Sequence, residues 1–356
     1  MARTVLQGRL SHSLRSLQVL LSTTATVLVR RAIKRPMVKE WTIPFEIGNL
    51  FYRHQFKHAL AMKNITDGRA YFDSLYNIAE PEPEVDVQPN GSNEPPGDWF
   101  IPRGHTSQNT ILYFHGGGYT FYATVSRRFI AMLAQRLQMP IFAPNYRLTP
   151  EHSHPAQIED AIAAYRYLLG RRIDPRKLIV AGDSAGGHLT LMTLLGLRNA
   201  ELPQPALAVG ISPWTDIGHR GASQFENDRY DLVQGDQTLQ YARWLKGRSG
   251  CSDASLSPTA QDFSGTAPVY LQAGSKEILV DMIRDFAHIL REQGVPVRLD
   301  VWKHMTHEFH GYGGTLQESR EAIDRIRAAI AQETANSSGT RFDASPQTEV
   351  DAWGKG

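Results

Sequence analysis

The stretch Leu-Ile-Val-Ala-Gly-Asp-Ser-Ala-Gly-Gly at residues 178–187 decides the fold of this 356-residue chain. Apolar residues lead into the pentapeptide Gly182-Asp183-Ser184-Ala185-Gly186, and a helix-prone segment follows it. A strand that turns sharply into a helix needs residues without side chains at the turn, and the turn leaves the central serine exposed above the sheet. The pattern therefore predicts a strand, a tight turn and a helix, with Ser184 as a candidate nucleophile.

Short apolar runs and amphipathic segments alternate along the chain around this stretch. The apolar runs are residues 111–114, 140–143, 178–181, 207–211, 269–273 and 297–302. Residues 157–169 and 280–290 place apolar side chains on one helical face. Each run has the length of a buried strand, and such alternation is typical of a mostly parallel sheet covered by helices. The sequence predicts the α/β class with a doubly wound sheet.

A glycine-rich loop, His115-Gly116-Gly117-Gly118, follows directly on the run at residues 111–114. Three consecutive glycines allow a bend whose N–H groups face a common point. Together with the N–H of Ala185 they would bind the oxyanion of a tetrahedral intermediate. A phosphate-binding loop is the alternative, but the loop lacks the GxGxxG spacing and the following Lys-Ser/Thr pair of such sites. We therefore favour the oxyanion site.

The serine hydroxyl needs a histidine to take its proton, and the histidine needs a carboxylate to orient it. In this topology the chain order is serine, acid and histidine, each at the carboxyl end of a strand. The loop after residues 269–273 offers Glu277 and Asp281 as acids. The loop after residues 297–302 offers three candidate bases, His304, His307 and His310.

These motifs resemble, in order and spacing, those of the hormone-sensitive lipase family of α/β-hydrolases, which includes carboxylesterases, arylacetamide deacetylases and many microbial esterases. The matching motifs are residues 115–118, Tyr146-Arg147-Leu148 with Pro150-Glu151 and Pro155-Ala156 ahead of Asp160, residues 182–187, and Ser212-Pro213-Trp214. The resemblance extends from about residue 98 to residue 313. It implies an α/β-hydrolase fold with a helical cap from about residues 41–76 and 214–260.

The resemblance also implies a role for each motif residue. It assigns Ser184 as the nucleophile, His307 as the base and Glu277 as the acid. It places the oxyanion donors at Gly116, Gly117 and Ala185, in motifs completed by His115, Gly118, Gly182, Asp183 and Gly186. Most members carry aspartate at the acid position, so Asp281 is the second candidate for that role.

The other polar residues of these segments have structural interpretations. We expect His304 and His310 in loops or at the rim of the site, His188 on the helix after Ser184, and His115 holding the glycine loop by hydrogen bonds. We expect Arg147 and Asp160 to form an ion pair and Asp183 to be structural.

The chemistry implied is hydrolysis of a carboxylic ester through an acyl-enzyme, with His307 relaying the proton of Ser184. Aromatic residues at 41–76 and 214–246 predict an apolar pocket for a small or medium substrate, such as an acetyl or short acyl ester or a lactone. No cofactor and no metal are implied. An acyltransferase, an amide deacetylase and a non-catalytic binding protein remain alternatives.

Charge is unevenly distributed along the chain. The net charge is +2, but residues 1–39 hold eight bases and no acid, which leaves 30 bases against 36 acids in the remainder. Within this head, the apolar stretch 17–29 is shorter than the roughly 20 residues of a spanning helix. It predicts a basic helix docked on the body or on a membrane surface, a transit-like leader, or a secretory signal.

The chain divides into a basic segment at residues 1–40, a hydrolase domain at 41–334 and a tail at 335–356 that we expect to be disordered. Residues 81–96 predict turns around one short strand at most. We expect a small-molecule ester and no nucleic acid as partner, with peripheral membrane contact through residues 1–39 and a homodimer left open. The lone Cys251 excludes an internal disulfide and favours the cytoplasm, while the basic head leaves a membrane or an organelle open.

Overall fold

The fold is built around a nine-stranded sheet in a computed structural model that describes residues 3–78, 84–335 and 348–350. The strands are β3 (Val85–Pro89), β4 (Gly97–Pro102), β5 (Thr110–Phe114), β6 (Ile141–Pro144), β7 (Leu178–Asp183), β8 (Leu207–Ile211), β9 (Val269–Gly274), β10 (Val297–Trp302) and β11 (Thr348–Val350). Their order across the sheet is β11-β10-β9-β8-β7-β5-β6-β4-β3. The strands from β5 to β11 pair in parallel, and β3 and β4 are antiparallel. All six predicted strands are present, and the α/β prediction is confirmed.

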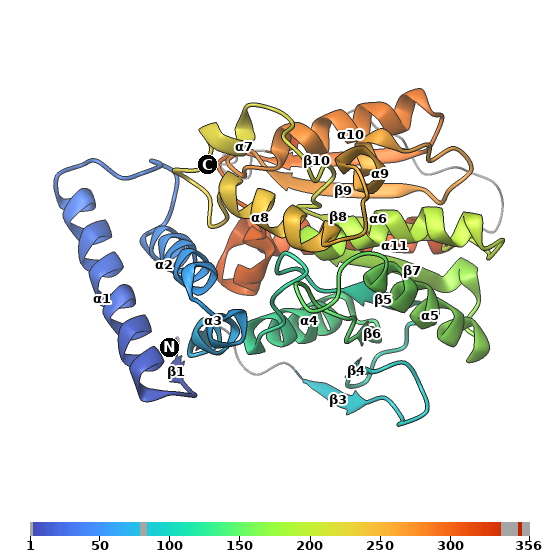
Figure 1. Cartoon of the computed structure of the whole chain (residues 1–356), viewed down its shortest axis with the longest axis horizontal. Coiled ribbons are helices and arrows are strands. Elements are labelled where there is room, and N and C mark those ends of the chain that lie inside the picture. The colour runs from blue at the N-terminus through green and yellow to red at the C-terminus, as the bar shows by residue number, and fades with distance from the viewer. Residues whose placement is uncertain (1–2, 79–83, 336–347, 351–356) are drawn as a thin grey trace.

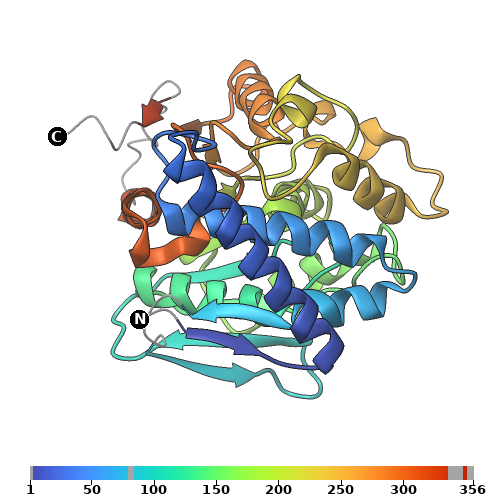
Figure 2. The ribbon, with the colours of Figure 1, turned by 90° about the vertical axis from the view of Figure 1, so that its left-hand side faces the viewer.

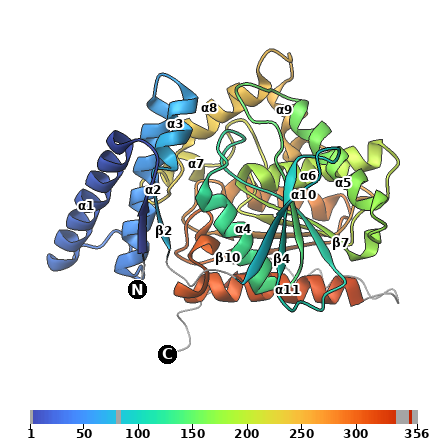
Figure 3. The same ribbon diagram turned by 90° about the horizontal axis from the view of Figure 1, so that it is seen from below.

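Helices cover both faces of this sheet, as Figure 3 shows. One face carries α4 (Thr124–Leu137) and α11 (Gln317–Ala335), and the other carries α5 (Ala156–Gly170), α6 (Ser184–Asn199) and α10 (Val280–Glu292). Successive side chains of a strand point to opposite faces. In β5, Leu112 and Phe114 accordingly join the core under α6, while Ile111 and Tyr113 join the core under α4.

The N-terminal part packs against one side of this body. It contains β1 (Arg3–Leu6) and β2 (Leu75–Ile78), which form a small antiparallel pair, and the helices α1 (Leu10–Ala32), α2 (Ile43–Ala61) and α3 (Ile65–Phe72). In Figure 1, α1 is the outermost element, with α2 and α3 between it and the sheet. The predicted helix in the basic head is therefore present and docked on the body. None of the helices in the described ranges is long and apolar enough to cross a membrane.

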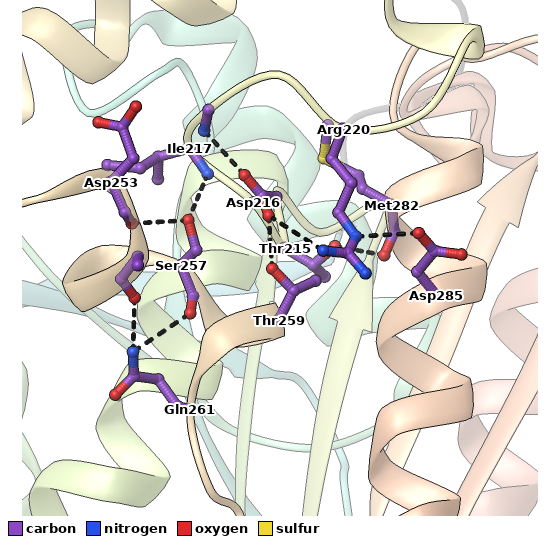
Figure 4. A network of polar contacts seen from close by, with 12 residues as sticks. Thr215, Asp216, Ile217, Arg220, Asp253, Ser257, Thr259, Gln261, Met282 and Asp285 are labelled. Carbon is purple, nitrogen blue, oxygen red and sulfur yellow. Dashed lines mark hydrogen bonds and ion pairs between the residues drawn. The ribbon is translucent and has the colours of Figure 1, made fainter.

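The segment between β8 and β9 includes residues 214–260, which we expect to form the second part of the cap. This segment contains α7 (Ser223–Glu226), α8 (Gly235–Lys246), α9 (Asp253–Leu256) and the 3-10 helix η2 (Pro258–Ala260). Two further 3-10 helices lie elsewhere in the chain: η1 (Pro175–Lys177) precedes β7, and η3 (Phe309–Thr315) precedes α11. Figure 4 shows the hydrogen bonds that anchor the base of the insertion between β8 and β9: Ile217 to Ser257 (3.0 Å), Thr259 to Asp216 (2.5 Å), Thr215 to Met282 (2.8 Å) and Arg220 to Asp285 (2.9 Å). The first two bonds join the two ends of the insertion to each other, and the last two join its first end to α10.

The prediction of a disordered tail is wrong for three residues. Thr348–Val350 forms β11, which pairs in parallel with β10 through Asp300, Val301 and Trp302. Trp302 is fully buried, and Val350 packs in the same apolar cluster. Residues 336–347 and 351–356 lie outside the described residues. A short strand with few apolar residues gives no periodic signal, because its stability comes from its neighbour in the sheet.

Candidate active site

The site lies where the strand order reverses. After β5 the chain forms β6 on one side of it and then β7 on the other side. Ligands of open α/β sheets bind at such a point, beyond the carboxyl ends of the strands. The glycine loop follows β5, and Ser184 follows β7. Phe114 and Gly182, the residues before these two turns, are direct partners in the sheet. The topology therefore brings the two motifs together.

Ser184 stands on the predicted strained turn between β7 and α6. Its backbone φ is +51°, in the left-handed region that residues other than glycine rarely adopt. The flanking glycines permit the turn because a Cβ at Gly182 would come 2.4 Å from the carbonyl oxygen of Gly186, and one at Gly186 would come 1.9 Å from that of Phe114. This close packing of strand and helix raises the serine hydroxyl into the pocket.

The glycine loop is held by its histidine, as expected. The ring of His115 lies between Tyr122 and Tyr146, with centroids 4.0 and 4.2 Å away, and its Nδ1 lies 2.8 Å from the carbonyl oxygen of Gly116. The Tyr146 hydroxyl donates to the carbonyl oxygen of His115 (2.6 Å). Burial lowers the pKa of His115 to about 4, so this stacked ring is neutral at pH 7.

The expectation that Gly116 is an oxyanion donor is wrong. Its N–H donates to the carboxylate of Asp183 at 2.9 Å, and the Tyr113 hydroxyl donates to the other oxygen at 2.6 Å. Gly117 and Gly118, with φ of +97° and +61°, line the pocket instead. Asp183 thus has the structural role expected of it. Its carboxylate accepts the hydrogen bond of the Gly116 N–H, so this group does not point into the pocket.

Glu277 follows β9 and is fully buried. Its Oε2 accepts hydrogen bonds from the Ser212 hydroxyl and the Gly274 N–H, both at 2.8 Å. Its Oε1 is buried and has no hydrogen-bond partner in the described part of the chain. Burial raises the pKa of Glu277 to about 8, and the charge of Asp231 adds to the effect. One carboxylate oxygen is therefore fixed, and the other is left for a further donor.

His307 follows β10 and is 1% exposed. Its Nδ1 is buried and likewise lacks a partner among the described residues, and its Nε2 lies 3.5 Å from Oε1 of Glu308. Burial lowers the pKa of His307 to about 3, which keeps the imidazole neutral and able to accept a proton. The unsatisfied Glu277 Oε1 and His307 Nδ1 have the complementary chemistry of a carboxylate and an imidazole N–H.

The rival candidates are engaged elsewhere. The carboxylate of Asp281 accepts from the backbone N–H of Ser223 at 2.9 Å, where α10 meets α7. His304 is partly exposed, 3.7 Å from Glu40. His310, expected in a loop or at the rim, is fully buried on η3, and its Nε2 lies 2.7 Å from Oε1 of Gln272.

Two other expectations about structural residues are met. His188 lies on α6 with its ring nitrogens 2.5 Å from the Tyr119 hydroxyl and 2.6 Å from the carbonyl oxygen of Leu256. The Arg147 guanidinium donates to both carboxylate oxygens of Asp160, at 2.8 to 3.0 Å. These groups brace the scaffold around the site.

The pocket itself brings the catalytic candidates to one place. Its walls are Phe56, Gly117, Gly118, Ser184, Trp214, Val233, Thr238, Tyr241, Leu279, His307 and Glu308. Phe56 comes from α2, and four wall residues come from the insertion between β8 and β9.

Among the described residues, no group of three or more His, Cys, Asp or Glu side chains could hold a metal ion.

Known proteins match this chain in both sequence and structure. The family described as alpha/beta hydrolase fold matches residues 111–311. An esterase from the bacterial hormone-sensitive lipase family has the same fold, with a TM-score of 0.69 and 26% identity over 92% of this chain and 100% of its own. The chain belongs to the hormone-sensitive lipase family of α/β-hydrolases.

Several relatives of this hydrolase carry names that describe hydrolases and lipases. An acetyl-hydrolase from Streptomyces hygroscopicus is 35% identical over 67% of this chain and 84% of its own length. An ethyl acetate hydrolase from Pseudomonas putida is 32% identical over 62% of this chain and 72% of its own. A hormone-sensitive lipase from a metagenome library has a TM-score of 0.71 at 28% identity, over 80% of this chain and 97% of its own. The protein is a carboxylic ester hydrolase.

One site residue of this hydrolase was missed by the sequence reasoning. Glu308 lines the pocket beside His307, with a backbone φ of +51°. Its carboxyl group meets that of Asp183 under the glycine loop, since a Cβ at Gly116 would come 2.2 Å from Asp183 Oδ2 and 2.7 Å from Glu308 Oε1. Burial, and then the charge of Asp183, raise the pKa of Glu308 well above its usual range. Each of these two adjacent carboxyl groups disfavours a negative charge on the other.

A second missed residue, Asp231, connects the loops that carry Glu277 and His307. It is fully buried, and its carboxylate accepts hydrogen bonds from the N–H groups of His307 (2.9 Å), Ile278 (2.7 Å) and Leu232 (2.9 Å). An isolated aspartate in a polar insertion carries no sequence signal of such a role. Only the fold shows that this residue faces both loops.

Proposed function

We propose that this hydrolase cleaves small to medium apolar carboxylic esters by a Ser-His-Glu mechanism. The observation that carries the proposal is the meeting of Ser184, His307 and the glycine loop in one pocket. Ser184 attacks the acyl carbonyl, and Nε2 of His307 takes its proton and returns it to the leaving alcohol. Water then repeats these steps on the acyl-enzyme. The N–H groups of Gly117, Gly118 and Ala185 receive the oxyanion, since that of Gly116 is engaged.

Glu277 is the proposed acid because its free oxygen and Nδ1 of His307 both lack a partner in the described structure. Burial disfavours a charge on either group alone. A carboxylate on Glu277 and an imidazolium on His307 therefore stabilise each other in the transition state, where the proton has moved onto the histidine. The bonds from Ser212 and Gly274 keep the carboxylate from rotating.

The walls of the pocket support a short acyl group. Trp214 and Tyr241 are nearly fully buried and Phe56 is 9% exposed, so the space beside Ser184 is bounded by side chains already packed in the core. A long acyl chain would have to displace one of these aromatic residues. We expect acetate and butyrate esters of p-nitrophenol to be cleaved faster than the decanoate ester.

Covalent labelling tests the nucleophile. A serine-directed phosphonate should add one equivalent to the wild-type protein, at Ser184 by peptide mass spectrometry, and Ser184→Ala should not be labelled. Turnover of p-nitrophenyl acetate by Ser184→Ala should fall about 10³-fold or more. A label on another residue, or turnover that survives in Ser184→Ala, would exclude the proposed mechanism.

The acid is tested by two matched carboxyl-to-amide substitutions. Glu277→Gln should lower kcat about 10²- to 10⁴-fold with little change in KM, because the imidazolium loses its partner. Asp281→Asn, four residues away, should keep kcat within a few-fold, because Asp281 bonds only to α7 and Arg284 in the described structure. The opposite result would make Asp281 the acid.

A further inference from the structure

We propose that the outer face of α1 binds an anionic lipid surface. The exposed face of this helix carries a row of large apolar side chains: Leu10, Leu14, Leu21, Leu28 and Val29, which are 49 to 73% exposed. The leucines recur at intervals of four and seven residues, so they lie along one side of the helix. Surface helices of globular proteins normally turn such a row toward the core.

The most deeply buried positions of α1 are mainly polar, and Leu17 and Leu20 beside them are half-buried. Its buried residues are Ser13, Ser16, Thr23 and Val27. The Ser16 hydroxyl lies 2.8 Å from that of Ser74 and accepts a hydrogen bond from Gln55 at 2.9 Å. These bonds set the rotation of α1, and with this rotation the leucines face outward.

An ion pair fixes the other end of the helix. Arg31 donates to the carboxylate of Glu46, which is fully buried, and also to the carbonyl oxygen of Trp41 at 2.6 Å. Removing α1 from the body would leave a buried carboxylate on α2 without its cation. The helix is therefore held as a fixed part of the protein, and its apolar row cannot turn inward without breaking these contacts. In Figure 2, α1 lies in front of α2, on the side of the molecule that faces the viewer.

Charge identifies the kind of surface that would cover this row. The segment before residue 40 has eight bases and no acid. Arg15 on α1, and Lys34, Arg35 and Lys39 just beyond it, are exposed. Exposed apolar side chains flanked by bases are typical of helices that lie in the headgroup region of an anionic bilayer. A second copy of the chain would bring two positively charged helices together, so self-association through this face is disfavoured.

The experiment uses the full chain and sedimentation with phosphatidylcholine vesicles, with or without roughly a quarter of phosphatidylglycerol. We expect binding to the anionic vesicles that weakens with salt. The double variant Leu14→Gln/Leu21→Gln should lower the partition coefficient about tenfold or more, because two exposed leucines no longer enter the interface. Lys34→Gln/Arg35→Gln should lower it about tenfold, and only for the anionic vesicles.

The matched control is Val87→Gln, which replaces a 44% exposed side chain on β3. It should bind as the wild type does. Melting temperature and p-nitrophenyl acetate turnover should be unchanged in all variants, because the substituted side chains are exposed and outside the pocket. The proposal would be overturned if the wild-type protein did not bind anionic vesicles, or if the leucine double variant bound them as well as the wild type does. It would also be overturned if the leucine double variant lost self-association and kept its vesicle binding.

Discussion

Oε1 of Glu308 lies 3.5 Å from Nε2 of His307, the nitrogen that we propose accepts the proton of Ser184. When Glu308 and Asp183 share one proton, only one negative charge lies under the glycine loop. When the pair loses that proton at alkaline pH, a second negative charge appears beside the proposed oxyanion position. That charge opposes the developing oxyanion and lowers kcat. We therefore expect the pair to set an upper pH limit to the reaction.

We predict that Glu308→Gln moves the alkaline fall of kcat to higher pH. The reason is that the amide cannot ionise, so the second charge never forms. The measurement is the pH profile of kcat for a p-nitrophenyl ester, corrected for uncatalysed hydrolysis. Glu40→Gln, which removes a carboxyl near His304 instead, should keep the wild-type profile. An unchanged alkaline limb in Glu308→Gln would show that the pair does not control it.

At the scale of elements, the site depends on two loops that are far apart in the chain. Glu277 follows β9 and His307 follows β10, and Asp231, from the cap, accepts hydrogen bonds from the backbone of both loops. Burial raises the pKa of Asp231 to about 7, and the backbone donors oppose that rise. Asp231 is thus a positioning residue, because it acts on the reaction through the placement of other groups.

We predict that Asp231→Asn lowers kcat about tenfold or more, leaves KM within a few-fold, and lowers the melting temperature by several degrees. An amide has one acceptor oxygen, so one loop loses its bond and a buried N–H is left unsatisfied, at about 1–3 kcal/mol. Asp228→Asn is the control, since Asp228 accepts from Gly235 within the cap. If the two variants had the same kcat, the coupling of the loops through Asp231 would be refuted.

Periodic apolar runs predicted the strands and crossover helices of this fold, because strands buried on both faces of a parallel sheet are mostly apolar. The GxSxG and glycine-loop motifs located Ser184 and the loop opposite it. Which glycine N–H groups face the pocket could not be predicted, because Asp183, 67 residues away, bonds to Gly116. Glu308 and Asp231 were missed for the same reason: their roles depend on contacts between distant segments. The three residues of β11 gave no signal of their own.

At the scale of the whole molecule, several carboxyl groups are buried in the fold, among them Asp231 and Glu277. Burial raises the pKa of Asp231 to about 7 and that of Glu277 to about 8. A carboxyl group whose pKa is raised by folding contributes stability below its unfolded pKa, near 4, and this stability is lost as the pH rises through the folded value. Above pH 7, histidines are neutral in both folded and unfolded chains, so the carboxyl groups dominate this dependence.

We predict that the free energy of unfolding falls by about 1–2 kcal/mol between pH 7 and pH 9. Circular dichroism during thermal or urea unfolding at both pH values measures this change. Glu277→Gln should show a smaller fall, because the amide has no proton to lose. A stability that rises across this range in the wild type would mean that neither carboxyl group is held neutral in the fold.

The pairing of β11 with β10 affects more than the length of the sheet. An uncovered edge strand presents backbone N–H and C=O groups that can pair with another chain. β10 is mostly buried and apolar, and the N–H of Lys303 donates to the carbonyl oxygen of Val350 just beyond it. Shortening the chain before residue 348 would uncover the backbone edge of β10 next to the His307 loop. Resistance to aggregation in this hydrolase therefore rests in part on three residues near the end of the described chain.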